Sequence, residues 1–333
     1  MIQILIPTYN RPICIKNMFE YGINKYKGNL FKFTIYDSSE GNETSTIVCQ
    51  NIKQYQLNSV IYVRCDSKIL PDLKMMTAIQ NVEEEFFWII GDGNLVDFYG
   101  FEKFLLSNKY NFFDVINVEH VYRINRQNNK KRYNRDIIYQ YNNSVEFAKK
   151  YFSHLTYWGA TIIRTKFFEI TYKKGSINKY IYKKIPWWIA CLIFEACEFN
   201  LQLGTTVNLG TVYSSYVSYN PAKTDHGWTK GNQYYDYVFT KFNQAIDMLP
   251  EHYNDIKKDI IICFRNDSLV SNSYLLYLRS KRVLTLNLIR EYYDEIEVVP
   301  GFYHKMCLYS LLPIRMAIIG EYIKKFLKRL FID

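Results

Sequence analysis

The sequence predicts an α/β protein built on a mostly parallel sheet, and two short segments carry that prediction. Residues 2–10 and 86–94 each begin as an apolar, β-branched or aromatic run and stop abruptly at small and polar residues. Such runs are typical of buried parallel strands. Their carboxyl ends form the edge at which open α/β sheets bind ligands. We therefore expect a ligand site where these two strands end.

The first hundred residues alternate between strand and helix patterns, which is the third observation behind the fold class. Apolar runs predict the strands, apolar residues at helical spacing predict the helices, and clusters such as Asp37-Ser38-Ser39-Glu40-Gly41-Asn42 mark the turns between them. The expected strands are 2–6, 31–36, 59–64 and 86–90, and the expected helices are 13–25, 44–54 and 73–82. This order predicts parallel strands joined by right-handed helical crossovers.

The pattern changes after Gly93 and becomes mainly helical from about Tyr234. We expect strands at 113–121 and 155–164, a basic loop at 123–135, and an apolar helix at 187–199 that Pro186 opens near its first turn. The later helices are expected at 234–248, 254–266, 271–278 and 284–296. We place a soft boundary near Gly231, which divides the chain into a domain of residues 1–230 and a helical extension of residues 231–333.

Composition limits the classes of function. The 333 residues suffice for one large domain with an appendage or for two domains, and a hydrophobic content of 48% excludes a disordered protein. The formal net charge of +10 favours an anionic partner, such as a nucleotide diphosphate or an anionic lipid. The basic residues form no continuous stripe, and we expect no nucleic-acid partner.

The cysteines and the apolar runs predict the compartment. The seven cysteines are scattered and form no C-x-x-C pair, which favours free thiols in a reducing compartment and disfavours a zinc site. No signal peptide precedes Ile2, and no stretch has the roughly 18 uncharged apolar residues that a spanning helix needs. We expect a cytoplasmic protein.

The segment Pro7-Thr8-Tyr9-Asn10 places short polar side chains and backbone groups at the tip of the first strand, where they can hydrogen bond a base and a ribose. An ordinary strand-to-helix loop is the alternative. The segment lacks the glycine pattern of a dinucleotide-binding loop, which disfavours that kind of site. Asp37, the first polar residue after the second strand, can accept from an imide or a ribose hydroxyl, or it can simply form the turn.

Asp92 follows a buried run and stands between two glycines. Glycines impose no side-chain bulk, so a ligand can approach this carboxylate closely. Mg²⁺ and Mn²⁺ prefer oxygen ligands and take one or two protein carboxylates beside substrate phosphates. The alternative is a tight hairpin turn at Gly91-Asp92-Gly93.

Together, residues 6–12, Asp37 and residues 87–93 resemble the family 2 nucleotide-sugar glycosyltransferases of the GT-A fold, of the type that builds bacterial surface polysaccharides. The resemblance covers residues 1–100 and continues weakly to about residue 230. It implies a Rossmann-like, mostly parallel central sheet flanked by helices, here followed by the helical extension. It also implies inverting, metal-dependent transfer of a sugar, most commonly from UDP, to a glycan or lipid-linked acceptor in cell-surface polysaccharide assembly.

The resemblance assigns roles to individual residues. Pro7, Thr8, Tyr9 and Asp37 match positions that hold the base and ribose of the nucleotide, and Lys74 matches a residue that faces it. Asp92 matches the aspartate that binds Mg²⁺ or Mn²⁺, with the ion bridging the diphosphate of the donor.

The chain departs from the family pattern at the metal motif and at the catalytic base. Gly91-Asp92-Gly93-Asn94 has one carboxylate where two or three are usual, and Ile185-Pro186-Trp187-Trp188 stands where the family has an acidic base. Glu195 and Asp225 are the alternative candidates for the base. His226 lies in a loop that can close over the diphosphate, where it would be a further metal or phosphate contact.

Residues 302–332 combine apolar residues with Lys and Arg around Pro313. This pattern is typical of a basic amphipathic helix, which can rest on anionic lipid at the inner face of the cell membrane or pack on the protein itself. The alternative to an enzyme is a non-catalytic, degenerate nucleotide-binding protein associated with the membrane. A nucleotidyltransferase is disfavoured because the chain does not begin with a glycine-rich basic loop.

Overall fold

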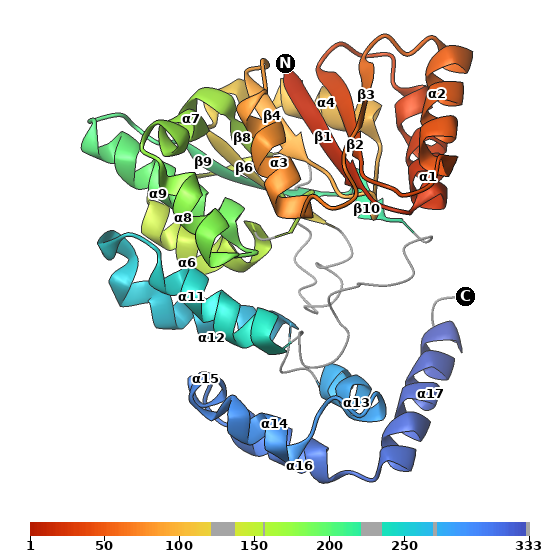
Figure 1. Cartoon of the computed structure of the whole chain (residues 1–333). Helices are drawn as coiled ribbons and strands as arrows, with labels where there is room; N and C mark the ends of the chain where they lie inside the picture. The colour runs from red at the N-terminus through yellow and green to blue at the C-terminus, as the bar shows by residue number, and fades with distance from the viewer. Residues whose placement is uncertain (121–136, 156, 221–234, 269–271, 331–333) are drawn as a thin grey trace. The chain divides into compact units, whose positions relative to one another are not determined.

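The structure is a computed structural model that describes residues 1–120, 137–155, 157–220, 235–268 and 272–330 (Figure 1). The chain divides into two compact units. The first comprises Met1–Phe147, His154–Lys184 and Trp188–Asp225, and the second comprises Ala148–Ser153, Ile185–Trp187 and His226–Asp333. The predicted boundary near Gly231 lies outside the described residues, as does the basic loop predicted at 123–135.

The first unit is built on a sheet that has eight strands among the described residues, in the order β3-β2-β1-β4-β8-β6-β9-β7. The strands are β1 (Ile2–Thr8), β2 (Phe31–Asp37), β3 (Val60–Arg64), β4 (Phe86–Ile89), β6 (Val115–His120), β7 (Tyr139–Tyr141), β8 (Thr161–Arg164) and β9 (Leu209–Ser214). β1 pairs in parallel with β2 and β4, and β2 with β3. β8 is antiparallel to β4 and β6, β9 is parallel to β6, and β7 is antiparallel to β9. The predicted mostly parallel sheet is confirmed.

Helices cover this sheet, and a small second sheet adjoins it. The helices between the first strand and β9 are α1 (Pro12–Tyr21), α2 (Glu43–Tyr55), α3 (Pro71–Gln80), α4 (Phe98–Ser107), α6 (Ser144–Leu155), α7 (Thr165–Lys173), α8 (Ser176–Lys183) and α9 (Trp188–Gln202). The second sheet pairs β5 (Asn94–Val96) with β10 (Val217–Tyr219) in antiparallel fashion.

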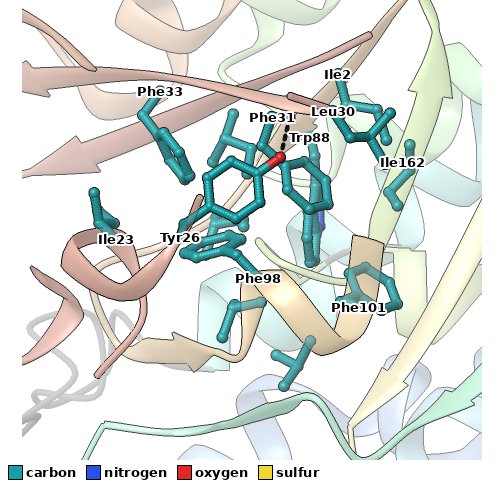
Figure 2. Packing of buried hydrophobic residues seen from close by; sticks show 14 of the residues in the cluster. Ile2, Ile23, Tyr26, Leu30, Phe31, Phe33, Trp88, Phe98, Phe101 and Ile162 are labelled. Carbon is teal, nitrogen blue, oxygen red and sulfur yellow. Dashed lines mark hydrogen bonds between the residues drawn. The ribbon is translucent and has the colours of Figure 1, made fainter. Parts of the chain in front are cut away.

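A hydrophobic core cluster lies on one face of the sheet and is rich in aromatic rings (Figure 2). Alternate residues of a strand point to the same face, so Ile2, Ile4 and Ile6 of β1 all join this cluster. Tyr26 packs edge-on against Phe33, and its hydroxyl accepts a hydrogen bond from the backbone N–H of Phe31 at 2.9 Å. On the other face, Phe87 of β4 packs against α7 through Phe168. The two buried faces explain why β1 and β4 are continuous apolar runs.

Several predicted elements differ in their ends, for identifiable reasons. The helix predicted at 13–25 ends at Tyr21, and a 3-10 turn at Ile23–Lys25 follows it. Gly22 between them lies close to β5, since a β-carbon there would be 2.3 Å from the backbone oxygen of Val96. The strand predicted at 155–164 is confined to Thr161–Arg164. Gly159, with a φ of 98°, donates its N–H to the carbonyl of Ile89 and turns the chain into β8.

The second unit is mainly helical, as predicted. A π-helical turn at Asp236–Lys241 leads into α11 (Phe242–Asp247), and the chain continues through α12 (Lys257–Ser268), α13 (Asn272–Ser280), α14 (Leu286–Glu291), α15 (Tyr293–Glu297), α16 (Phe302–Leu311) and α17 (Ile314–Leu330). Pro313 separates α16 from α17, as the sequence predicts. Gly320 lets α17 approach α13, since a β-carbon there would lie 2.7 Å from a methyl group of Leu276.

Among the described residues, no single helix has both the length and the apolar character to cross a membrane. α16 and the first part of α17 reach that length and composition only as a pair, and the pair is bent by 103°.

Candidate functional site

The loops that follow β1 and β2 are joined to each other at the carboxyl edge of the sheet. The Tyr9 hydroxyl donates to Glu40 at 3.0 Å, and the backbone N–H of Asn10 donates to the Ser39 hydroxyl at 2.8 Å. The side-chain oxygen of Asn10 also accepts a hydrogen bond from the backbone N–H of Glu40 at 3.0 Å. Asn10 has a φ of 51°, a left-handed conformation that Asn tolerates better than most residues. The two loops therefore form one polar surface beside Thr8.

Asp37 lies at the end of β2 and is fully buried, with 0% of its surface exposed. One carboxylate oxygen accepts from the Tyr62 hydroxyl at 2.8 Å and from Arg64 at 3.1 Å, and the other accepts from the backbone N–H of Ser39 at 2.8 Å. Arg64 also donates to the backbone oxygen of Gly41. Asp37 thus anchors the β2–α2 loop through Arg64, and the turn role that the sequence left open is present. Its contact with a nucleotide stays a prediction.

Lys74 extends from the first turn of α3 to the ends of β1 and β2. Its ammonium donates to the Ser38 hydroxyl at 2.7 Å, to the carbonyl of Tyr36 at 3.2 Å and to the carbonyl of Thr8 at 3.4 Å. Burial lowers the pKa of Lys74, and the nearby acidic groups of Cys65, Asp37 and Asp92 partly offset that effect. A cation therefore lies directly beneath the polar surface formed by the two loops.

Asp92 lies beside Thr8 and is 4% exposed. The Thr8 hydroxyl donates to one oxygen of the Asp92 carboxylate at 3.0 Å, and the Arg11 guanidinium pairs with the other at 2.9 Å. The fold thus brings the predicted residues Thr8, Lys74 and Asp92 together at one edge of the sheet. Arg11 is part of the sequence motif, but residue type alone does not predict its pairing with Asp92.

The loop that carries Asp92 is held by contacts with Asn220 and with Trp158. The buried side-chain amide of Asn220 donates to the carbonyl oxygens of Asp92 and Cys14, at 3.1 and 3.0 Å. The Asn94 amide donates to the carbonyl of Trp158 at 3.2 Å. β4 and β5 lie in different sheets, so Gly91-Asp92-Gly93 is not the turn of a hairpin between them. Neither glycine has a positive φ, and a β-carbon on Gly91 would make only ordinary contact with Trp158 at 3.7 Å.

A divalent ion at this edge would have one carboxylate to bind. Among the described residues, no three His, Cys, Asp or Glu side chains come together as a metal site. Each oxygen of Asp92 accepts one of the two hydrogen bonds described above, and a carboxylate oxygen has two lone pairs. The residues therefore fit an ion held mainly by a bound diphosphate, with Asp92 as its protein ligand. Such an ion has to share Asp92 with Arg11 or displace it.

The two candidate bases fall in different places. Glu195 lies in the second turn of α9, is 2% exposed and contacts Tyr180 and Lys179 of α8. It is seven residues into the helix, about 10 Å from its first residue. Asp225 and His226 lie outside the described residues.

Comparison with solved structures shows which fold the chain has. A scan of the sequence against family models, and a search against curated proteins, give no match. The crystal structure of S. aureus TarS 1-349 is similar with a TM-score of 0.55 at 13% identity, over 96% of this chain and 87% of that one.

Two further structures contain ligands. TarS 1-349 in complex with UDP-GlcNAc has a TM-score of 0.54 at 12% identity, over 97% of this chain and 91% of that one. The mannosyltransferase PcManGT from Pyrobaculum calidifontis, in complex with GDP-Man and Mn²⁺, has a TM-score of 0.51 at 10% identity, over 98% of this chain and 86% of that one. At these identities the comparison establishes the fold.

Proposed function

From the GT-A fold, shared with TarS and PcManGT over almost the whole chain, we propose that this protein transfers a sugar from a nucleotide donor to an acceptor hydroxyl. The observation that carries the proposal is the convergence of Thr8, Lys74 and Asp92 at the carboxyl edge of the sheet. The complexes with UDP-GlcNAc and with GDP-Man support a nucleotide-sugar as donor, and UDP is favoured by the sequence resemblance.

In this proposal, the donor nucleotide lies on the joined loops after β1 and β2. Pro7, Thr8 and Tyr9 contact the base and ribose, and the buried Asp37 contributes either directly or by holding Arg64 in place. The Lys74 ammonium adds positive charge beneath the nucleotide. Its effect is strengthened by burial, since water screens a buried charge less than an exposed one.

The bond that breaks joins the sugar to a diphosphate, so catalysis has to stabilise the negative charge that develops on the leaving group. Mg²⁺ or Mn²⁺ bound to Asp92 would neutralise part of that charge when present. Arg11 and Lys74 supply positive charge from the chain itself. We further propose an inverting reaction, in which a base takes the proton of the acceptor hydroxyl. The candidates for this base from the sequence are Glu195 and Asp225. His226 is proposed as a further contact to the metal or the phosphate.

The acceptor in this proposal is a glycan or a lipid-linked glycan in cell-surface polysaccharide assembly. α16 and α17 support a position at the inner face of the membrane, because several of their large apolar side chains are exposed. These are Leu308, Leu311, Met316, Ile318, Ile319, Tyr322 and Ile323. The sequence adds Lys324, Lys325, Lys328 and Arg329 directly afterwards, and basic residues beside an apolar helix face favour anionic lipid.

The test is turnover of a panel of UDP-, GDP- and dTDP-sugars, with and without Mn²⁺ and with and without an acceptor. We expect turnover of at least one donor, and we expect Asp92→Asn to lower kcat by about 100-fold and to abolish the response to Mn²⁺. A variant with full activity and an unchanged response to Mn²⁺ would show that Asp92 is not the metal ligand.

A non-catalytic nucleotide-binding protein is the second candidate, and one observation favours it: the single carboxylate of the metal motif is already paired with Arg11. Saturable binding of UDP or GDP, with no turnover of any donor in the panel, would establish this alternative.

A further inference from the structure

The first turns of α3 and α9 lie at the same edge of the sheet as Thr8 and Asp92. α3 connects the parallel strands β3 and β4, so it runs antiparallel to them and begins at their carboxyl ends. β9 runs in the direction of β4, through the pairings of β8 and β6. α9 precedes β9 by a short connection and runs back across the sheet, so it begins at the carboxyl edge as well.

A side-chain hydrogen bond joins these two helix starts. The indole N–H of Trp188, the first residue of α9, donates to Asp72 in the first turn of α3 at 3.0 Å. Trp188 is buried, whereas Asp72 is partly exposed. The Trp188 ring thus fixes one oxygen of a part-buried carboxylate at the edge of the sheet.

Asp72 and Lys74 are two residues apart on α3 and therefore point to different sides. Lys74 extends to the ends of β1 and β2, beneath the proposed nucleotide position. Asp72 faces α9, on the other side of the helix from the nucleotide loops. A base in this position requires the acceptor to approach from the α9 side of α3.

Asp72 differs in its hydrogen-bond partner from Asp37 and Asp92, the two acidic residues at the ends of β2 and β4. Asp37 is paired with Arg64, and Asp92 is paired with Arg11, so each of those carboxylates has a guanidinium as its partner. Among the described residues, the hydrogen-bond partner of Asp72 is a neutral indole. A carboxylate without a cationic partner is the better proton acceptor, because an adjacent positive charge favours the ionised form.

We propose that Asp72 is the catalytic base, positioned by Trp188; this inference rests on the proposed glycosyl transfer. The acceptor hydroxyl gives its proton to the free oxygen of Asp72, and the hydroxyl oxygen forms a bond to the anomeric carbon. The bond between that carbon and the diphosphate oxygen breaks, and its electron pair leaves with the nucleoside diphosphate. Asp72 then releases the proton to water.

The local environment suits this role. Burial raises the pKa of Asp72 to about 6, and the hydrogen bond from Trp188 opposes that rise. No charged side chain on α3, on α9 or elsewhere in the described part of the chain contributes to this shift. A base with a pKa near the working pH is ionised at neutral pH and still accepts a proton readily.

The first test compares Asp72→Asn with the wild type, using the donor that the panel identifies. Asparagine can still accept the hydrogen bond from Trp188 but cannot take a proton. We expect kcat to fall by about 100-fold or more, while the Kd for UDP and the melting temperature stay close to those of the wild type. Asp66→Asn is the matched control, because Asp66 is an exposed aspartate in the turn before α3, and it should retain the wild-type rate.

The second test uses the pH profile of kcat. The wild-type rate should fall as the pH drops through about 6, the range in which the Asp72 pKa lies. Trp188→Phe removes the N–H that stabilises the carboxylate, so the acid limb should move up by roughly one pH unit, with the rate recovering at higher pH. A purely structural role of Trp188 would not shift the limb.

The possible outcomes separate the two proposals. If the wild type turns over no donor, the proposed function fails and the base assignment fails with it. If the wild type is active and Asp72→Asn keeps its rate, or Trp188→Phe leaves the acid limb in place, the assignment of Asp72 is overturned while glycosyl transfer stands. A large loss in Glu195→Gln beside an active Asp72→Asn would assign the base to Glu195.

Discussion

Arg11 occupies one oxygen of the carboxylate that the sequence predicts as a metal ligand. The pair is partly exposed on the arginine side and nearly buried on the aspartate side. An arriving divalent ion has to weaken this pair, because both cations compete for the same carboxylate. In the proposed function, breaking the pair between Arg11 and Asp92 adds to the free-energy cost of metal binding.

We predict that Arg11→Gln tightens Mn²⁺ binding to the UDP complex. Ion pairs with an exposed partner contribute up to about 1 kcal/mol, so the Mn²⁺ concentration for half-saturation should fall by about threefold to fivefold. Calorimetric titration of Mn²⁺ into the UDP-saturated variant measures the change. Lys16→Gln is a control, since Lys16 pairs with Glu20 on the exposed side of α1. Weaker Mn²⁺ binding in Arg11→Gln would instead place Arg11 on the diphosphate in the bound state.

At the scale of secondary-structure elements, Asn220 joins three segments around the Asp92 loop. Its side chain is buried, donates to the carbonyls of Cys14 in α1 and Asp92, and accepts from Asn17 at 3.0 Å. The backbone N–H of Asn220 donates to the carbonyl of Gly93 at 2.9 Å. The residue therefore fixes the position of Asp92 relative to α1.

We predict that Asn220→Ala destabilises the protein by about 2–3 kcal/mol, because two buried carbonyls lose their donor. The donor KM should rise in the same variant, since the Asp92 loop is no longer held. Urea unfolding and UDP titration measure the two effects. Asn17→Ala removes only one of these bonds, from a partly exposed position, and should cost less than half as much. An equal loss of unfolding free energy in both variants would contradict the proposal that Asn220 holds the Asp92 loop.

The strands, and the edge at which the predicted site residues meet, were predictable because each depends on a local pattern. The apolar runs place β1, β2 and β4 within two residues of their observed ends, and parallel topology then brings Thr8, Asp37 and Asp92 to one edge. The contacts that complete the site are not local. Arg11 and Asp92 are 81 residues apart, Asp72 and Trp188 are 116 apart, and Asn220 and Asp92 are 128 apart.

The helices α4, α6, α7 and α8 were missed for a different reason. Asp97 caps α4 by accepting from the backbone N–H of Gly100 at 3.0 Å, but the aromatic residues that follow have no strong helix preference. α7 begins directly at the end of β8, with no Gly or Pro to mark the change. α4 and α6 do begin at side-chain caps, from Asp97 and Asn143, but Asp and Asn are equally typical of turns.

At the scale of the whole molecule, the net charge of +10 and the exposed apolar side chains of α16 and α17 would both favour the anionic lipid surface of the proposed function. An anionic lipid surface attracts the positive charge of the protein at separations up to about one Debye length. At contact, burial of the apolar side chains in the membrane interface strengthens the binding. Leu311 and Ile319 are 65% and 56% exposed, on opposite sides of the Pro313 break. Each can therefore lose contact with water on a lipid surface without unfolding either helix.

We predict that the protein binds vesicles of phosphatidylglycerol and phosphatidylcholine at low salt, and binds pure phosphatidylcholine more weakly. The double variant Leu311→Asp with Ile319→Asp should bind the anionic vesicles at least tenfold more weakly, since burying one such side chain contributes about 1.5–3 kcal/mol. Leu203→Asp is the matched control, because Leu203 is 69% exposed in the turn after α9 and should leave vesicle binding unchanged. Sedimentation with the vesicles measures all three proteins. Equal binding of the wild type and the double variant would show that this face does not contact lipid. A change in the oligomeric state of the double variant would instead assign the face to a second copy of the chain.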